Sequence, residues 1–233
     1  MNKIILLPGI LFCLIMMSPT AQSARGNEYK MPEHTSERIK LPGPKYDSST
    51  SVEEALLKKR SVRVFKEGPV MLAELSQLIW AAQGMTDPRG LRTAPSAGAL
   101  YPLELYVVAG DVNGLPQGLY KYVPGRHELL GLSKGDWRKD LCNAGLGQSS
   151  IRRAALVLVL SGVYERTTAK YGERGIRYVH MEAGHAAQNV YLQAVPLELG
   201  TVVIGAFQDE EVKRLLKMGA GESPLYKMPV GKR

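Results

Sequence analysis

The chain has 233 residues, of which 45% are hydrophobic, and its formal net charge is +8. This length and apolar content suffice for one domain with a sizeable core and are too small for two ordinary domains. The basic residues are scattered rather than gathered into a stripe with aromatic residues, and no DNA-binding motif is present. The sequence therefore argues against a nucleic-acid-binding protein.

Residues 1–23 have the pattern of a secretory signal peptide. Lys3 supplies a positive start, an uncharged apolar run follows, and Ala21 and Ser23 offer small residues at a cleavage site. The apolar run is shorter than the ~20 residues of a membrane-spanning helix. We therefore expect an exported protein, periplasmic or extracellular, with an uncleaved membrane anchor as the less favoured alternative. Cleavage would leave Cys142 as the single cysteine, so no internal disulfide is expected.

An arm and two helices are predicted to follow the leader. Residues 24–50 are rich in proline, glycine, serine and lysine without periodicity, which is typical of an extended linker. Ser51 followed by Glu54 has the pattern of a capping box, which predicts a helix over residues 52–60. Apolar residues at helical spacing predict a second helix over residues 71–83.

Strands are predicted for the middle of the chain. Residues 103–109 have the composition of a strand, and residues 154–163 form a continuous apolar run, as in a strand that is buried on both faces. Residues 119–123 and 129–132 flank Pro124-Gly125, which predicts a hairpin.

The C-terminal part is predicted to begin with a long helix over residues 178–199, mostly apolar or small, that crosses the middle of the fold. Pro196 is expected to bend or end this helix. Residues 201–207 are predicted as a buried strand, Asp209 begins a short helix, and residues 226–230 can add a last strand. The chain is thus predicted to be α+β, with a sheet packed by helices and one helix at its centre.

A basic cluster stands at the end of the first predicted helix and comprises Lys59, Arg60, Ser61 and Arg63. Guanidinium groups can donate paired N–H bonds to phosphate oxygens, and a serine adds a hydroxyl donor. The alternative is a solvated helix end, whose cations suit the negative end of the helix dipole. Taken alone, the cluster favours the solvated helix end.

A run of small residues precedes the strand predicted at residues 103–109 and comprises Pro95, Ser96, Ala97 and Gly98. Without bulky side chains, backbone N–H and C=O groups can approach a flat ligand closely. The alternative is an ordinary tight turn that feeds the strand. The presence of the basic cluster upstream favours the ligand site.

Four motifs occur in order: Arg-Ser-x-Arg at Arg60, Pro-Ser-x-Gly-Ala-Leu-Tyr-Pro-x-Glu at Pro95, Gly-His-x-x-Gln-Asn at Gly184, and Ile-Gly-Ala-Phe at Ile204. Together they resemble the FMN-dependent nitroreductase-like flavoproteins. Within these, the chain is most similar to the branch of the SagB-type dehydrogenases, which oxidise azoline rings in modified peptides. The resemblance implies one FMN-binding domain over residues 51–233. It also implies a nitroreductase-like fold with a mixed or antiparallel central sheet, and a homodimer.

The resemblance also implies which residues contact FMN. Those implied at the phosphate are Lys59, Arg60, Ser61, Arg63, Lys232 and Arg233. Those implied at the ring are Pro95, Ser96, Ala97 and Gly98, supplied by the partner subunit, together with Ile204 and Gly205, whose backbone faces flavin N5. Many members carry an acidic or polar residue where Ile204 stands, so backbone contact alone is left at N5. The alternatives are that Gly205 merely ends a strand and that the last two residues form a frayed tail.

The activity that the resemblance implies is an FMN-dependent oxidoreductase with two half-reactions. A donor, expected to be NAD(P)H, passes a hydride to flavin N5 and leaves, and a small acceptor is then reduced. The alternatives are a SagB-type dehydrogenase that oxidises azoline rings in peptides, and a flavin-binding protein without turnover. No metal site is assigned, because the four histidines lack the spacing of metal ligands. No catalytic side chain is assigned, because the reactive atom belongs to the cofactor. By position alone, Tyr171, Arg174 and Tyr178 are expected to line the substrate side.

Overall fold

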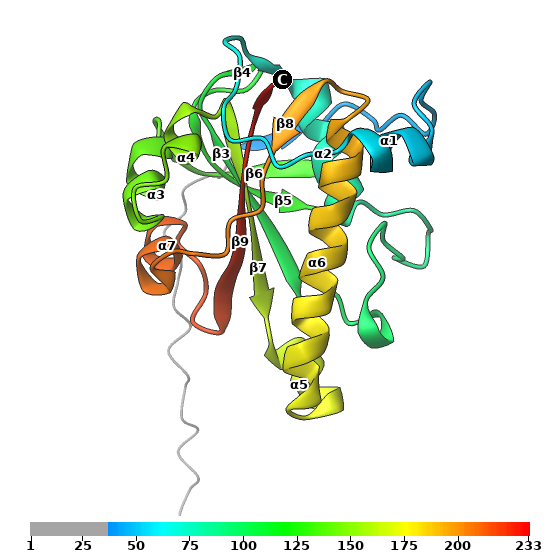
Figure 1. The fold of residues 1–233 in the computed structure, drawn as a ribbon. Coiled ribbons are helices and arrows are strands. Elements are labelled where there is room, and N and C mark those ends of the chain that lie inside the picture. The colour runs from blue at the N-terminus through cyan, green and yellow to red at the C-terminus, as the bar shows by residue number, and fades with distance from the viewer. Residues whose placement is uncertain (1–36) are drawn as a thin grey trace, which may run out of the picture. The chain divides into compact units, whose positions relative to one another are not determined.

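A seven-stranded sheet forms the centre of residues 37–233, the part of the chain that the computed structural model describes (Figure 1). Its strands lie in the order β1 (Arg38–Lys40), β6 (Glu128–Lys134), β5 (Gly118–Val123), β3 (Leu103–Ala109), β7 (Leu156–Val163), β9 (Glu222–Lys232) and β8 (Leu199–Thr201). All neighbouring strands of this sheet are antiparallel. A separate parallel pair is formed by β2 (Val70–Met71) and β4 (Val112–Asn113). The predicted α+β class and antiparallel central sheet are confirmed.

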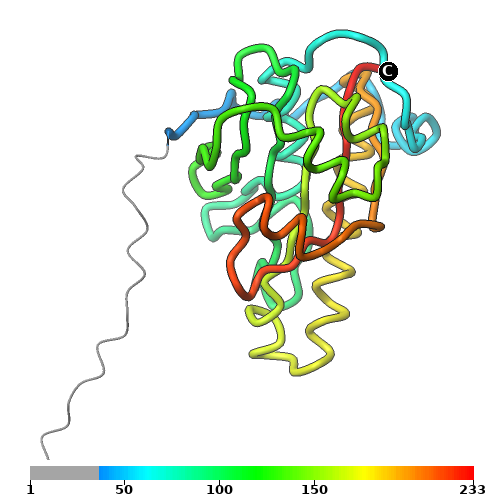
Figure 2. Tube along the Cα trace, turned by 90° about the vertical axis from the view of Figure 1, so that its left-hand side faces the viewer, coloured from blue at the N-terminus to red at the C-terminus, as the bar shows by residue number. Residues whose placement is uncertain are grey.

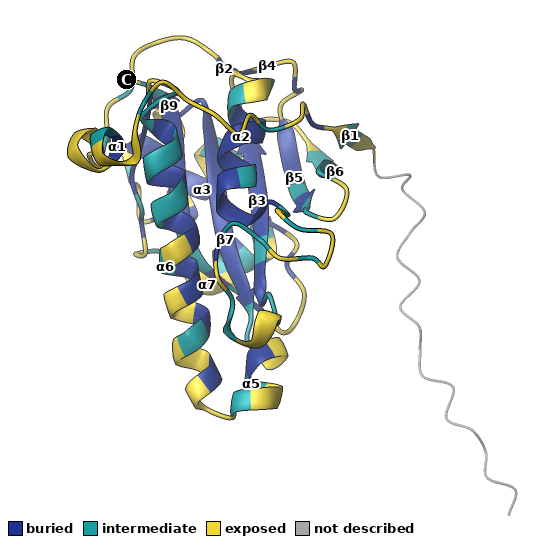
Figure 3. Cartoon of the chain, turned by 90° about the vertical axis from the view of Figure 1, so that its right-hand side faces the viewer, coloured by how far each residue is buried: buried dark blue, intermediate teal, exposed yellow. Residues whose placement is uncertain are grey.

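Helices cover both faces of the sheet. They are α1 (Val52–Lys58), α2 (Leu72–Gln83), the short 3-10 helix η1 (Ala97–Ala99), α3 (Arg138–Ala144), α4 (Ser149–Arg153), α5 (Glu165–Tyr171), α6 (Arg174–Ala194) and α7 (Asp209–Leu215). Figure 3 shows α2 and α6 over one face, and Figure 2, from the opposite side, shows the segments of α3, α4 and α7 in front of the strands. No helix within the described residues is both long and apolar enough to span a membrane.

Alternating side chains of the central strands supply two cores. On β3, Leu105 and Val107 pack with α2 and α6, whereas Tyr106 and Val108 pack with α3, α4 and α7. Successive side chains of a strand point to opposite faces of the sheet, so one apolar strand can contribute to the core on each face. This is why the continuous apolar run in β7 correctly predicted a strand buried on both faces.

The long helix α6 is confirmed, with bounds shifted from the predicted residues 178–199. It begins at Arg174, just after Gly172 ends α5 with a φ of 58°, and it ends at Ala194. Pro196 lacks the N–H needed for a further helical hydrogen bond, so the helix stops before it. The start was missed because the first turn of α6 is largely exposed and carries no apolar periodicity.

The strand predicted over residues 201–207 is wrong. The ladder between β8 and β9 stops at Thr201, and beyond it only Ile204 pairs with Lys227, through two N–H···O bonds of 2.9 Å. In this register Pro229 stands opposite Val202 and has no N–H to donate, so the ladder is interrupted. The residues after Thr201 are thereby freed to form a loop.

The described part of the predicted arm, residues 37–50, is not extended linker throughout. It contains β1, which pairs with β6 at the edge of the sheet, and Leu41 donates to the carbonyl of His127 at 3.1 Å. A three-residue strand with two cations is too short to show a period of two in the sequence. The predicted signal peptide lies outside the described residues.

Candidate functional site

Residues 59–66, which we call the basic segment, cross the ends of β8 and β9 beside the C-terminus (cyan in Figure 1). Val62 donates its N–H to Thr201 O at 2.9 Å, and Lys66 donates to Lys232 O at 3.0 Å. A Cβ added at Gly200 would lie 2.6 Å from Val62 Cγ1, so the segment lies directly against the strand backbone. The structure thus brings the predicted basic cluster next to the last residues of the chain.

The cations of this cluster differ in what they already bind. Arg63 is exposed and forms no ion pair with any described residue. Arg60 donates from Nη1 to the carbonyls of Leu57 and Lys59, at 2.8 and 2.7 Å. Lys232 is held by Glu74, whose carboxylate oxygens lie 2.7 and 2.9 Å from its Nζ.

The other predicted cations are partly anchored as well. Arg233 donates from Nη1 to Lys58 O at 3.2 Å, so the C-terminal residue is tied to the end of α1 rather than frayed. The Lys59 ammonium lies 4.6 Å from the ring centroid of Tyr191, a cation–π distance. Arg63 and Lys59 are therefore the cations of the cluster that keep their N–H donors for a ligand.

Gly205 lies in the loop that follows β8. Its buried neighbour Ile204 packs into the second core, whereas Gly205 and Ala206 are exposed. Among the described residues, no group accepts a hydrogen bond from the N–H of Gly205 or of Ala206. The loop therefore presents two free backbone N–H donors to a ligand. In the predicted strand, hydrogen bonds to a neighbouring strand would have occupied such donors.

A cavity of about 250 Å³ adjoins Gly205. Tyr164, His180 and Tyr226 line it, and the Tyr164 hydroxyl lies 2.6 Å from His180 Nε2. Burial is the main cause of a raised pKa for the Tyr164 hydroxyl, and the Asp209 carboxylate adds to it. The cavity thus combines aromatic walls with a proton-bearing pair beside the free amides.

The small-residue loop, residues 95–98, packs on α5. Gly98 has a φ of +64°, and a Cβ added there would lie 2.8 Å from the Tyr171 hydroxyl and 3.1 Å from Lys170 Nζ. Tyr171 stacks edge-on against Tyr178, with ring centroids 5.2 Å apart. No hydrogen bond or ion pair within the described chain joins this loop to the basic segment. The structure therefore does not unite the two predicted halves of the site within one chain.

A buried carboxylate stands near this loop. Glu182 on α6 is 2% exposed, and its Oε1 has no hydrogen-bond partner in the structure as described. Burial raises the pKa of Glu182 to about 7, against the opposing effects of the nearby Ser96 hydroxyl and the Arg92 guanidinium. Sequence reasoning missed Glu182, Lys170 and Tyr191, because each acts through a packing contact that no local pattern shows.

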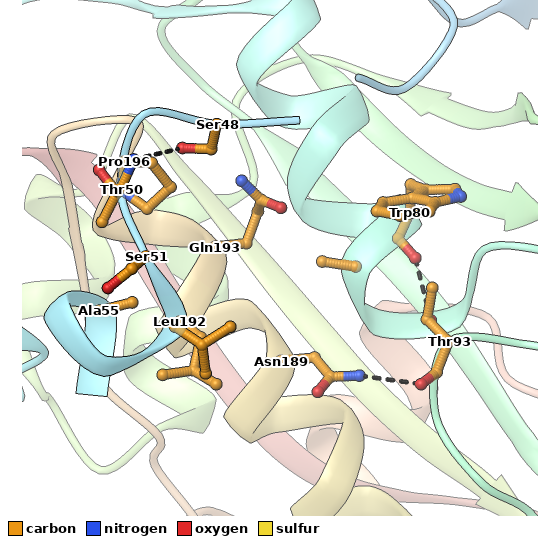
Figure 4. A pocket seen from close by; sticks show the side chains of 12 residues that line it. Ser48, Thr50, Ser51, Ala55, Trp80, Thr93, Asn189, Leu192, Gln193 and Pro196 are labelled. Carbon is orange, nitrogen blue, oxygen red and sulfur yellow. Dashed lines mark hydrogen bonds between the residues drawn. The ribbon is translucent and has the colours of Figure 1, made fainter. Parts of the chain in front are cut away.

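A second cavity, also of about 250 Å³, opens between α2, α6 and the chain before α1 (Figure 4). Trp80 and Thr93 lie in its wall, and Asn189 donates from Nδ2 to Thr93 O at 3.3 Å. Its lining is uncharged and includes none of the predicted site residues. It therefore does not fit a phosphate.

The sequence matches the profile of the Nitroreductase family over residues 56–232. The chain belongs to this family. It is 50% identical over 182 residues to MJ1384 of Methanocaldococcus jannaschii, which carries a provisional nitroreductase name. That match covers 78% of this chain and 91% of MJ1384. The nitroreductase-family assignment makes the chain an oxidoreductase, as predicted.

Solved structures confirm the nitroreductase-like fold. A chain from Anabaena variabilis, which also carries a provisional nitroreductase name, has a TM-score of 0.75 and 29% identity. The match covers 87% of the present chain but only 43% of the Anabaena chain. A chain of the Escherichia coli microcin synthetase McbBCD complex, solved with truncated pro-MccB17, has a TM-score of 0.64 and 23% identity. Here the match covers 86% of this chain and 79% of that one.

Proposed function

We propose that this nitroreductase-family chain is an FMN-dependent oxidoreductase that passes a hydride from a reduced donor, NAD(P)H, to a small acceptor. The observation that carries the proposal is the basic segment, fixed at the edge of β8 and β9 with the exposed Arg63 guanidinium in no ion pair among the described residues and the Ser61 hydroxyl exposed beside it. Tyr191 links this segment to the loop that bears the free amides of Gly205 and Ala206.

The residues present fit the phosphate of FMN. Arg63 offers a guanidinium without an ion pair, Ser61 an exposed hydroxyl, and Lys59 an ammonium. Such charge-assisted bonds are stronger than those between neutral groups. Arg60 and Lys232 would first have to leave their present acceptors, so we assign them smaller contributions. Arg233 holds the end of the chain in place.

The loop after β8 fits the flavin ring. The N–H groups of Gly205 and Ala206 would donate to its edge, and the absent side chain at Gly205 leaves room for close approach. When bound, FMN supplies an atom, N5, that accepts and releases a hydride. Tyr164 and His180 would hold the second substrate in the adjoining cavity and offer it a proton.

We further propose a homodimer in which the small-residue loop completes the partner's site. The small-residue loop forms no hydrogen bond or ion pair with the described basic segment of its own chain. This is expected if the loop contributes to the site of a second chain. Exposed apolar side chains on α1 and α6 support a buried interface: Leu56, Leu57, Ile176 and Met181 are 52%, 72%, 44% and 51% exposed. Singly exposed apolar residues are common, but several on two adjacent helices indicate an interaction surface.

A second candidate function is oxidation of azoline rings in a peptide by a SagB-type dehydrogenase. The similarity to a chain of the microcin synthetase complex favours it. A third is flavin binding without turnover. Anaerobic addition of an azoline-containing peptide or of NAD(P)H to the flavin-loaded protein separates the three: the peptide, the nucleotide or neither would bleach the flavin absorbance.

We also propose that the protein is exported, on the pattern of residues 1–23. Fractionation of cells that express the full chain tests this. Recovery of a shortened chain outside the cytoplasm supports export, and a full-length cytoplasmic chain contradicts it.

The main experiment is the absorbance spectrum of the purified protein. We expect a yellow protein that releases noncovalent FMN on denaturation and whose flavin is bleached by NAD(P)H without oxygen. A protein that stays colourless after incubation with FMN would overturn the proposal.

A further inference from the structure

Tyr191 lies at the centre of three hydrogen-bonded groups from different segments. It sits on the inner side of α6 and is 9% exposed. The Val203 N–H donates to its hydroxyl oxygen at 2.9 Å, and the same oxygen lies 3.0 Å from Ser61 Oγ. One side chain thus joins the basic segment to the loop that leads to Gly205.

The directions of these bonds follow from the chemistry of the groups. A backbone N–H can only donate, so the Tyr191 oxygen accepts from Val203. The phenol proton then needs an acceptor, and within residues 37–233 the one within hydrogen-bond distance is Ser61 Oγ. A buried hydroxyl proton without an acceptor is unfavourable, so Tyr191 donates to Ser61.

Ser61 is therefore left with a proton for a third group. Ser61 is exposed, and no other described residue hydrogen-bonds its hydroxyl. The neighbouring cations Lys59 and Arg63 favour an anion at this place. A phosphate oxygen is an acceptor only, so it matches a hydroxyl whose own oxygen is already occupied.

We propose that Tyr191 is a positioning residue for the phosphate of FMN. The Val203 N–H occupies the acceptor site of the Tyr191 hydroxyl, so the phenol donates to Ser61 and directs the Ser61 proton toward a phosphate oxygen. This inference rests on the proposed function, because it concerns the same cofactor. It differs from a merely structural role in one respect: the effect of the hydroxyl should depend on the phosphate.

Riboflavin provides the matched ligand, since it has the ring of FMN and no phosphate. The test measures the affinities of the full chain for FMN and for riboflavin in the wild type, Tyr191→Phe, Ser61→Ala and the double variant. Tyr191→Phe keeps the ring beneath Lys59 and removes only the hydroxyl. Tyr120→Phe is the control, because Tyr120 lies on the distant strand β5 and the change removes a hydroxyl that donates to Pro116 O.

We expect Tyr191→Phe and Ser61→Ala each to weaken FMN binding about tenfold, the effect of one lost hydrogen bond to a charged group. The double variant should lose little more than Ser61→Ala, because Tyr191 acts through Ser61. Riboflavin affinity should stay unchanged in all variants, and Tyr120→Phe should bind FMN like the wild type.

Equal losses for FMN and riboflavin, no loss in Tyr191→Phe, or additive losses in the double variant would each overturn the inference. Should Tyr191→Phe fail to fold, Ser61→Ala and Ser61→Thr decide: the inference requires a loss specific to FMN in the first and rescue in the second. A wild-type chain that binds riboflavin and FMN equally refutes the phosphate assignment. A chain that binds neither refutes the proposed function itself.

Discussion

The basic segment and the small-residue loop both supply predicted cofactor contacts, yet the fold holds them differently. The basic segment is bonded through its backbone to the edge of β8 and β9, and Tyr191 joins it to the Gly205 loop. The small-residue loop packs on α5, near the buried Glu182, without a bond to those elements. Under the proposed function, one chain supplies all the residues of the phosphate site, whereas the loop would contribute to the site of a second chain.

Replacing the free cation of the basic segment should have the largest effect. Arg63→Ala removes a charge-assisted bond to phosphate, which is worth about 1.5–3 kcal/mol. We expect FMN affinity to fall about ten- to hundredfold, with riboflavin affinity unchanged. Titration of flavin fluorescence measures both, with Arg152→Ala, an exposed arginine on α4, as the control. An Arg63→Ala chain with wild-type FMN affinity would show that Arg63 faces only solvent.

Adding a Cβ to the small-residue loop should weaken FMN binding less than Arg63→Ala does. Gly98→Ala places a side chain at a φ of +64°, against the Tyr171 hydroxyl at 2.8 Å. The left-handed conformation alone costs about 1–2 kcal/mol. Gly90→Ala is the control, because Gly90 also has a positive φ and has no atom within 4 Å of its added Cβ. Both variants should lower the melting temperature, but only Gly98→Ala should weaken FMN binding; equal FMN affinities would refute a role for the loop.

The carboxylate beside the loop should make stability depend on pH. Its folded pKa of about 7 exceeds the ordinary value of 4.5. The folded chain therefore binds more protons between these values, and the stability that Glu182 contributes is present below about pH 4.5 and lost as the pH rises through 7. Between pH 5 and 8, Glu182→Gln should lose less unfolding free energy than the wild type, by on the order of 1 kcal/mol. Parallel curves for the two proteins in urea unfolding would contradict this.

The smallest effect is expected at Gly184 on α6, where an added Cβ meets no atom of the same chain within 4 Å. In an isolated chain Gly184→Ala should stabilise the helix by about 0.5–1 kcal/mol. If α6 packs against a second copy at this point, the same change should also loosen the dimer. Light scattering on dilution, beside thermal unfolding, measures both. A more stable chain with an unchanged dimer would place the interface elsewhere.

Much of the fold could be predicted from the sequence, because local periodicity determines it. The apolar run of β7 and the helical spacing of α2 each correspond to an observed element. The strand predicted over residues 201–207 failed because its end depends on Pro229, which is distant in sequence and opposes Val202 across the ladder. Such long-range pairing leaves no local signal.

In the candidate site, too, local sequence patterns predicted some features and missed those that depend on long-range packing. The basic segment and the small-residue loop could be predicted as cofactor contacts because their residue types suit a phosphate and a flat ligand and because four ordered motifs resemble one family. The roles of Tyr191 and Glu182 could not, because both look like ordinary positions of a long helix. Only the packing of α6 places Tyr191 beside Ser61 and Glu182 near Ser96.

The most direct test of the shared site is complementation between two defective chains. Arg63→Ala and Gly98→Val chains are co-expressed, and FMN binding of the mixture is compared with each variant alone. If each site takes its basic segment from one chain and its loop from the other, a mixed dimer contains one intact site. Random pairing should then restore about a quarter of the sites to wild-type affinity. A mixture that binds FMN no better than the separate variants would show that each chain builds its site alone.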